Sequence, residues 1–127
     1  MLSSQVMDAI RQVTPDERLI TSPAGLYAYG FDASIHHRTP DVVVQPRSTE
    51  EVSAIVKIAD EHEIPVIARG SGTGLSGQAV PIQGGIVLDL SAMDRVLETN
   101  VEDLYCVVEP GVIYAKLNKQ LAPKKFF

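Results

Sequence analysis

The sequence predicts an α+β fold built on a short parallel β-α-β core with flanking helices. The first strand of this core is Val42–Val44, a fully apolar, β-branched run of the kind that lies buried on both faces of a sheet. The second strand is residues 64–68, and the segment between the two has the apolar period of an amphipathic helix. Because a strand, a helix and a strand in succession form a right-handed crossover, we expect the two strands to be a parallel pair.

The helix of the core has a clear beginning and one apolar face. Residues 45–47 turn the chain, and Ser48–Glu51 follow with the S-x-x-E pattern of a capping box. The helix should end near His62, ahead of Pro65. The apolar positions that share one face are Val52, Ile55, Val56 and Ala59.

The residues before the core are less regular. Residues 3–13 have a helical apolar period, with Ser3 or Ser4 as the N-cap. Residues 15–41 mix prolines, glycines and aromatic residues, which indicates an ordered but irregular approach segment. We therefore divide the chain into residues 1–40, an N-terminal helix with its approach segment, and residues 41–127, the regular part.

Four further segments are expected after the core. Residues 86–90 read as a third strand and residues 91–94 as a turn. Residues 104–108 form a fourth strand, which ends at Pro110-Gly111. A last helix covers residues 112–121, whose leucines and isoleucine recur on one face.

The composition excludes several classes of function. The chain has 127 residues, a net charge of −5 and 45% hydrophobic residues, as expected of one globular domain rather than a disordered chain. No run of Lys or Arg exceeds two residues, so a nucleic-acid partner is not expected. The sequence shows neither an apolar membrane span nor a signal segment. Together with the single cysteine, Cys106, these features predict a cytoplasmic protein.

The most informative segment is the glycine loop, residues 69–77, which reads Arg-Gly-Ser-Gly-Thr-Gly-Leu-Ser-Gly directly after the second strand. Its small residues let main-chain N–H groups approach a ligand closely. Successive N–H donors in such a loop form a concave site for an anion such as phosphate or pyrophosphate. Arg69 adds a cation, and Ser71, Thr73 and Ser76 add hydroxyl groups.

Three kinds of phosphate-binding loop compete for this segment. Residues 72–77 satisfy the G-x-G-x-x-G pattern of a dinucleotide-binding Rossmann unit, with Asp89 as a ribose-binding acid. That pattern requires the loop to open a helix, and the short, proline- and glycine-broken segment 78–85 argues against a helical crossover. Residues 72–79 match a P-loop except that Gln78 replaces the required lysine. The third kind binds pyrophosphate through its backbone alone, with no helix behind it.

Several segments, in this order and spacing, resemble one family: Pro40–Pro46, Ser48–Val52, Pro65–Gly77, Gly85–Leu88 and Pro110–Val112. Over about residues 25–122 the chain resembles the vanillyl-alcohol oxidase / p-cresol methylhydroxylase (PCMH-type) family of FAD flavoproteins. The likeness is greatest to the glycolate oxidase flavin subunit and related D-lactate and 2-hydroxy-acid dehydrogenases. The resemblance implies the first subdomain of a PCMH-type FAD-binding domain, in an enzyme that oxidises glycolate or D-lactate to the 2-oxo acid.

The resemblance also implies which residues hold the cofactor. In that family the loop after the second strand binds the FAD pyrophosphate through main-chain amides. Some relatives attach flavin through a histidine in this loop, and because Thr73 stands there we expect non-covalent FAD. The expected cofactor-binding residues are Pro46 at the end of the first strand, Arg69, Gly70, Ser71, Gly72, Thr73, Gly74, Leu75, Ser76 and Gly77 in the glycine loop, and Pro110, Gly111 and Val112 along the FAD cleft.

Other polar residues have plainer interpretations. His36 and His37 are interpreted as surface histidines and not as a shared metal site, because adjacent residues point apart. Cys106 is interpreted as a small buried hydrophobe. Arg69 could pair with phosphate or with a surface carboxylate, and both alternatives stay open. No catalytic residue is assigned.

The resemblance implies more protein than residues 1–127 contain: a second half of the flavin domain and a cap domain over the substrate. We therefore expect the N-terminal part of an FAD-dependent oxidoreductase, completed by a downstream half or a partner subunit. The alternative is a truncated, non-catalytic fragment that folds but has no turnover.

Overall fold

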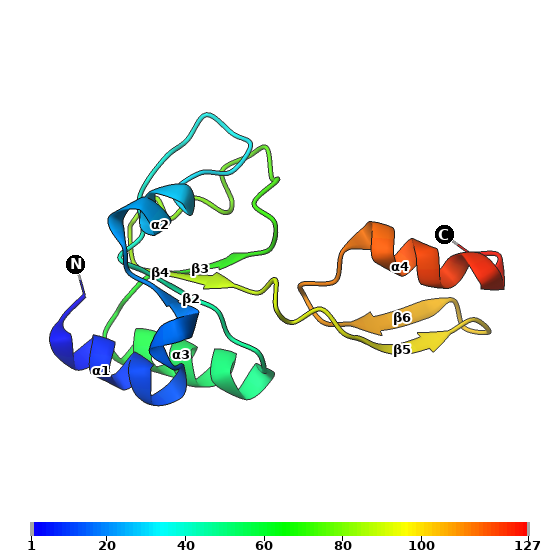
Figure 1. Cartoon of the computed structure of the whole chain (residues 1–127), viewed down its shortest axis with the longest axis horizontal. Helices are drawn as coiled ribbons and strands as arrows, with labels where there is room; N and C mark the ends of the chain where they lie inside the picture. The colour runs from blue at the N-terminus through cyan, green and yellow to red at the C-terminus, as the bar shows by residue number, and fades with distance from the viewer. Residues whose placement is uncertain (1, 127) are drawn as a thin grey trace.

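A mixed four-stranded sheet forms the centre of the larger lobe, residues 2–90, in the computed structural model of the chain, which describes residues 2–126 (Figure 1). The strands lie in the order β1 (Leu19–Ile20), β2 (Val42–Val44), β4 (Ile86–Asp89) and β3 (Val66–Arg69). β1 runs antiparallel to β2, whereas β4 is parallel to both β2 and β3. The parallel core predicted from the sequence is therefore present.

The predicted pairing of the two core strands is wrong in one respect, because β4 lies between them. Ile86 is the register partner of both Val42 and Val66. All residues of β4 are buried, and a central position gives its backbone a partner on each side. The crossover from β3 to β4, residues 70–85, contains no helix, so the parallel pair is joined by irregular chain.

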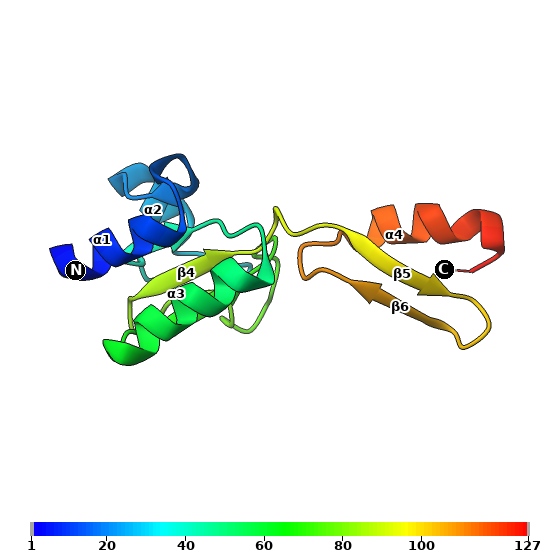
Figure 2. The ribbon, with the colours of Figure 1, turned by 90° about the horizontal axis from the view of Figure 1, so that it is seen from below.

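Helices α1 (Ser4–Val13) and α3 (Thr49–Glu61) cover one face of this sheet (Figures 1 and 2). The predicted helices are confirmed, with Ser3 as the N-cap of α1 and Ser48 as the N-cap of α3. Alternate strand residues point towards these helices and form the main core. Its buried members are Val6, Ile10, Val42, Val44, Ile55, Ala59, Ile86 and Leu88.

Only half of the predicted capping box is formed. The Ser48 hydroxyl accepts a hydrogen bond from the Glu51 main-chain N–H at 3.2 Å. The Glu51 carboxylate instead accepts from the Arg18 guanidinium at 2.6 and 3.0 Å and from the Arg47 N–H. This ion pair ties the chain before β1 to the first turn of α3.

The opposite face of the sheet carries the approach segment and the crossover (Figure 1). Part of the approach segment is regular, since it contains β1 and the helix α2 (Pro23–Ala28), neither of which was predicted. Ser22 caps α2, and Pro23 occupies its first turn. The approach segment reaches the glycine loop through a hydrogen bond from Ala33 N–H to the Gly74 carbonyl at 2.9 Å.

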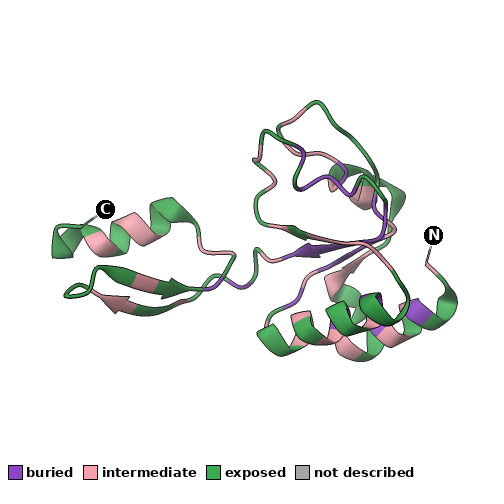
Figure 3. Cartoon of the chain, turned by 180° about the vertical axis from the view of Figure 1, so that it is seen from behind, coloured by how far each residue is buried: buried purple, intermediate pink, exposed green. Residues whose placement is uncertain are grey.

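The smaller lobe, residues 95–126, extends away from this sheet (Figures 1 and 2). It contains an antiparallel hairpin of β5 (Val96–Asn100) and β6 (Tyr105–Val108), and the helix α4 (Tyr114–Leu121). β5 was not predicted, whereas β6 and α4 were. Buried residues gather in the larger lobe, and the helix and strands of the smaller lobe hold none (Figure 3). No helix within residues 2–126 is long and apolar enough to cross a membrane.

Candidate functional site

The glycine loop presents a row of unpaired main-chain donors. Within residues 2–126, no N–H group of residues 70–75 donates a hydrogen bond to the protein. Gly72 has a φ of 67° and Gly77 a φ of 80°, a region that favours glycine. Because no helix follows the loop, the donors belong to the loop itself, as the backbone-only interpretation predicts.

A pocket of about 410 Å³ brings this loop together with the residues that follow β6. Gly70, Ser71 and Thr73 line it from the larger lobe. Pro110, Gly111 and Val112 line it from the smaller lobe. Two segments that the sequence predicted for one cofactor, and that lie far apart along the chain, therefore share one pocket.

Gly111 fixes the second of these segments. Its N–H donates to the Met93 carbonyl at 2.8 Å. A Cβ at this position would lie 2.3 Å from the Leu90 carbonyl oxygen and 2.8 Å from that of Met93. Only glycine lets the two main chains approach this closely, so residues 110–112 are held against the turn that follows β4.

Glu109 adds an ion pair behind this segment. Its carboxylate accepts from the Arg95 guanidinium at 2.6 and 3.0 Å and from the Arg95 N–H at 2.9 Å. These hydrogen bonds lower the pKa of the Glu109 carboxyl. The pair closes the base of the hairpin immediately before Pro110.

Arg69 contacts the approach segment. Its guanidinium donates to the Phe31 carbonyl oxygen at 2.5 Å and lies 5.2 Å from the centre of the Tyr29 ring. Within the described residues it pairs with no carboxylate.

Several predicted site residues lie outside the pocket. The side chain of Pro46 is fully buried, and Leu75 points into solvent with 78% of its surface exposed. Gly77 is buried, and a Cβ there would lie 2.9 Å from the His36 ring. Gly72 and Gly74 contribute to the loop but are not among the residues that line the pocket.

The structure adds residues that the sequence did not assign to this pocket. Ser91 comes shortly after the buried strand β4, and this position was the one feature of the sequence that could have indicated it as a pocket residue. Tyr114 and Lys116 lie in the first turn of α4, and no pattern in the sequence indicated that they line the pocket. Lys116 Nζ lies 3.7 Å from an oxygen of Asp94, which also lines the pocket.

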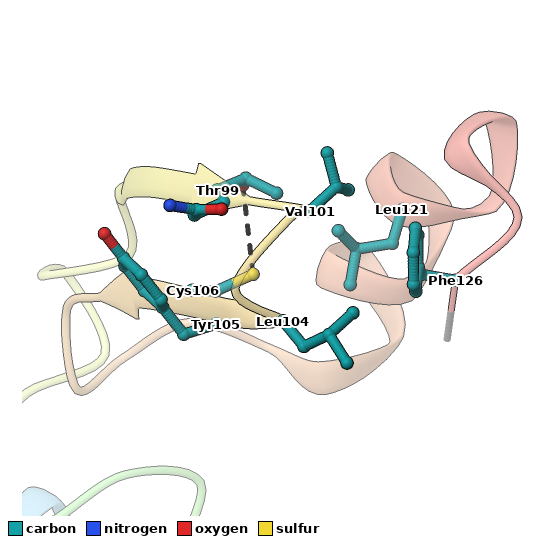
Figure 4. A pocket seen from close by; sticks show the side chains of 8 residues that line it. Thr99, Val101, Leu104, Tyr105, Cys106, Leu121 and Phe126 are labelled. Atoms are coloured by element: carbon teal, nitrogen blue, oxygen red, sulfur yellow. Dashed lines mark hydrogen bonds between the residues drawn. The ribbon is translucent and has the colours of Figure 1, made fainter.

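A second pocket, of about 300 Å³, lies in the smaller lobe between the hairpin and the end of α4 (Figure 4). Cys106 is half-buried there, and its Sγ lies 3.9 Å from the Thr99 hydroxyl. Leu104, Leu121 and Phe126 give this pocket an apolar lining, so it offers nothing that suits a phosphate.

The two histidines considered from the sequence have separate surroundings. His37 stacks on Phe31, with the ring centres 4.0 Å apart, whereas His36 lies against Gly77. Within residues 2–126, no three side chains of His, Cys, Asp or Glu gather in a way that could hold a metal ion.

The pocket between the lobes fits the diphosphate of FAD. A diphosphate needs several hydrogen-bond donors, and the N–H groups of residues 70–74 have no other partner. A Cβ at Gly70 would meet nothing within 4 Å, so the loop leaves open space on that side. Lys116 supplies a cation, and the hydroxyl groups of Ser71 and Thr73 supply further donors.

Comparison with known proteins shows the family of the chain. Residues 40–127 match a family described as an FAD binding domain. The chain is 38% identical over 128 residues to glycolate oxidase subunit GlcD of Bacillus subtilis (strain 168), covering 100% of this chain and 27% of that protein. It is 43% identical over 118 residues to a probable mitochondrial D-lactate dehydrogenase of Danio rerio, covering 92% of this chain and 24% of that protein.

Solved structures with the same arrangement include p-cresol methylhydroxylase with substrate bound, at a TM-score of 0.83, 25% identity and coverage of 95% of this chain and 24% of that one. A 4-ethylphenol oxidase from Gulosibacter chungangensis has a TM-score of 0.84, 29% identity and coverage of 98% of this chain and 26% of that one. The chain thus spans about a quarter of the length of the relatives it matches. These matches confirm the expected fold class and the PCMH-type resemblance, and the chain belongs to the FAD binding domain family of FAD-linked oxidoreductases.

Proposed function

We propose that this chain binds FAD without a covalent bond, with the diphosphate in the pocket between the glycine loop and residues 110–112. The observation that carries the proposal is the row of unpaired N–H groups over residues 70–75, of which Gly70, Ser71 and Thr73 line this pocket. Oxygen atoms of a diphosphate are suitable acceptors for those donors. Thr73 stands where some relatives carry a flavin-linked histidine, which supports non-covalent binding.

The residues of this chain would bind and orient the cofactor. The amides of residues 70–74 and the Lys116 ammonium group would hold the diphosphate. Val112 and Tyr114 give the other wall of the pocket an apolar and aromatic surface, which suits the flat, uncharged parts of a dinucleotide. FAD, when bound, supplies the capacity to accept two electrons from a substrate.

We further propose that the whole protein oxidises a small 2-hydroxy acid, glycolate or D-lactate, to the 2-oxo acid. The names of the two relatives support this substrate class. The alternative is a truncated, non-catalytic fragment that folds but has no turnover. A cytoplasmic location, expected from the single cysteine, belongs to the same proposal.

Titration of the purified chain with FAD tests the proposal. A ligand that binds only the folded chain stabilises it by about 2.7 kcal/mol at a concentration 100 times its Kd. We expect FAD and ADP to raise the melting temperature, and riboflavin, which lacks the diphosphate, to do so much less. Protein that stays colourless and gains no stability with excess FAD would contradict FAD binding.

Lys116→Gln gives a matched test of the pocket. It should weaken FAD binding several-fold and reduce the dependence of binding on salt, because one cation is lost near a phosphate. Lys119→Gln on the same helix lies outside the pocket and serves as the control. Adding glycolate or D-lactate to FAD-loaded protein then separates the two proposals: loss of the yellow flavin absorbance supports the oxidoreductase, and its persistence supports the non-catalytic fragment.

A further inference from the structure

A buried carboxylate lies behind the glycine loop. Asp89, the last residue of β4, is only 4% exposed. Its Oδ2 accepts from the Tyr29 hydroxyl at 2.6 Å and from the Gln45 side-chain amide at 2.9 Å, and its Oδ1 accepts from the Ser91 N–H at 3.1 Å. Asp89 therefore fixes Tyr29, in the approach segment, to the end of the sheet.

Arg69 connects this carboxylate network to the loop. It is the register partner of Asp89 on the neighbouring strand. Its guanidinium lies over the Tyr29 ring and donates to the Phe31 carbonyl. On its other side it fills the space beside Gly72, where a Cβ would lie 2.1 Å from an Arg69 nitrogen.

The approach segment also holds the loop directly, through the hydrogen bond from Ala33 N–H to the Gly74 carbonyl at 2.9 Å. The loop is thus supported at two points. The first point is the contact of Arg69 with Gly72. The second is the hydrogen bond to Gly74 from the approach segment, which Arg69 and Tyr29 hold in place.

The pKa values of Tyr29 and Asp89 are shifted in opposite directions. Burial, together with the hydrogen bond to Asp89, raises the pKa of Tyr29 to about 12. Burial opposes ionisation of Asp89, but the hydrogen bonds from Tyr29, Gln45 and Ser91 outweigh it and lower the pKa of its carboxyl. At neutral pH, Tyr29 is therefore the donor and Asp89 the charged acceptor.

We propose that Arg69 and Tyr29 are positioning residues for the glycine loop, and that the Arg69 guanidinium holds the loop main chain rather than the phosphate. This inference rests on the proposed function, because the ordered loop is the part that would bind the FAD diphosphate. The Arg69 guanidinium donates to the Phe31 carbonyl, lies beside Gly72 and does not line the pocket, so its position is against the loop main chain and not at the candidate diphosphate site.

The first arm of the test uses the chain without FAD. We expect ¹⁵N relaxation to give the amides of Gly70, Gly72 and Gly74 order parameters near 0.85 in the original chain and below about 0.6 in Arg69→Lys and Tyr29→Phe. Amides of α1 and α3 should not change, which distinguishes loss of positioning from general destabilisation.

Matched control variants come from the same residue types elsewhere. Tyr105→Phe removes a hydroxyl that donates to the Glu98 carboxylate at 2.6 Å in the smaller lobe. Arg11→Lys alters an exposed ion pair on α1. Neither should change the order parameters of the glycine loop. Should Arg69→Lys fail to fold, Tyr29→Phe alone decides this arm.

The second arm measures FAD affinity against salt. If Arg69 positions the loop, Arg69→Lys and Arg69→Gln both weaken binding by about tenfold with the salt dependence unchanged. If Arg69 binds phosphate, Arg69→Lys retains most of the affinity and Arg69→Gln reduces the salt dependence. The second result, or a loop that stays ordered in both Arg69→Lys and Tyr29→Phe, overturns the inference. Failure of the original chain to bind FAD contradicts the proposed function alone, because the relaxation arm still decides the role of Arg69.

Discussion

At the scale of single residues, two glycines of the pocket differ in what they tolerate. A Cβ at Gly111 would overlap main-chain carbonyl oxygens of residues 90 and 93, which have little freedom to move. A Cβ at Gly70 would meet nothing within 4 Å, and its backbone does not require a positive φ. Glycine is therefore needed for close packing at one position and not at the other.

Gly111→Ala should accordingly destabilise the chain by about 1–3 kcal/mol, the usual cost of overpacking against neighbours that cannot move away. Gly70→Ala should leave stability unchanged or raise it by about 0.4–1 kcal/mol, because the unfolded chain loses freedom. Urea unfolding of both variants checks this pair. An equal loss of unfolding free energy in the two variants would contradict the difference in the space available for a Cβ at the two positions.

The ion pair of Arg18 and Glu51 should make stability depend on pH. The hydrogen bond from Arg18 lowers the pKa of Glu51 in the folded chain, although partial burial opposes this. A lowered folded-state pKa stabilises the fold above the unfolded-state value of about 4.3 and loses that effect as pH falls through the lower folded-state value.

The free energy of unfolding of the original chain should therefore exceed that of Glu51→Gln at pH 7, and the difference should shrink as pH falls below about 4.3. Measuring urea unfolding of both proteins between pH 7 and pH 3 gives this difference directly. Arg18→Gln should show the same trend. If the difference in unfolding free energy does not change with pH, the ion pair is not its cause.

The residues of the site were only partly predictable. The glycine loop was predicted because its small residues allow close approach of the main chain to a ligand, and residues 110–112 only through the resemblance to a known family. Tyr114 and Lys116 were missed because they join the pocket only through the placement of α4, which no local pattern encodes. Arg69 was expected to pair with a phosphate or with a carboxylate, and its contact with Phe31 depends on how the approach segment folds back.

At the scale of elements, strong local signals gave correct predictions. α1, α3, β2 and β4 were found because each has an apolar period or run that matches its burial. α2 was missed because Pro23 and Gly25 read as loop residues, although the proline lies in the first turn, where it is tolerated.

β5 was missed for a different reason. Its sequence, Val96–Asn100, ends in polar residues, and none of its residues is buried. Only pairing with β6 across the hairpin makes it a strand. Local sequence patterns did not predict the order of the strands in the sheet either. An apolar run indicates that a strand is buried on both faces, but it does not indicate which strands lie beside it.

The N-cap of α1, which the sequence left between two serines, gives an element-scale prediction. The Ser3 hydroxyl accepts from the Val6 N–H at 3.3 Å. Ser3→Ala should therefore cost about 1 kcal/mol of stability. Ser4 is the first residue inside the helix, where alanine has the better propensity, so Ser4→Ala should cost nothing. Chemical denaturation that ranks the two variants in the opposite order would reassign the cap.

At the scale of the whole molecule, the candidate site lies between two lobes of unequal burial. The larger lobe holds the core, and the smaller one contributes residues 110–114 and Lys116 to the pocket although its helix and strands contain no buried residue (Figure 3). A ligand in this pocket would contact both lobes. Its binding should therefore stabilise the smaller lobe more than the larger one.

Hydrogen exchange of the hairpin amides measures this effect. If opening of the smaller lobe destroys the site, FAD at 100 times its Kd should slow exchange in β5 and β6 by about 100-fold. Amides of α1, which lies far from the pocket, should slow only to the extent that they exchange through global unfolding. Equal slowing in both lobes would indicate that the two open together.

The position of β4 between β2 and β3 also bears on biosynthesis. A ribosome that has released residues up to 85 has produced both outer parallel strands but not the strand that pairs with each of them. Until the chain has passed through the whole irregular crossover and β4 has emerged, β3 has no strand partner and β2 has only β1. The parallel part of the sheet should therefore form in one cooperative event, only after residue 89 has left the exit tunnel.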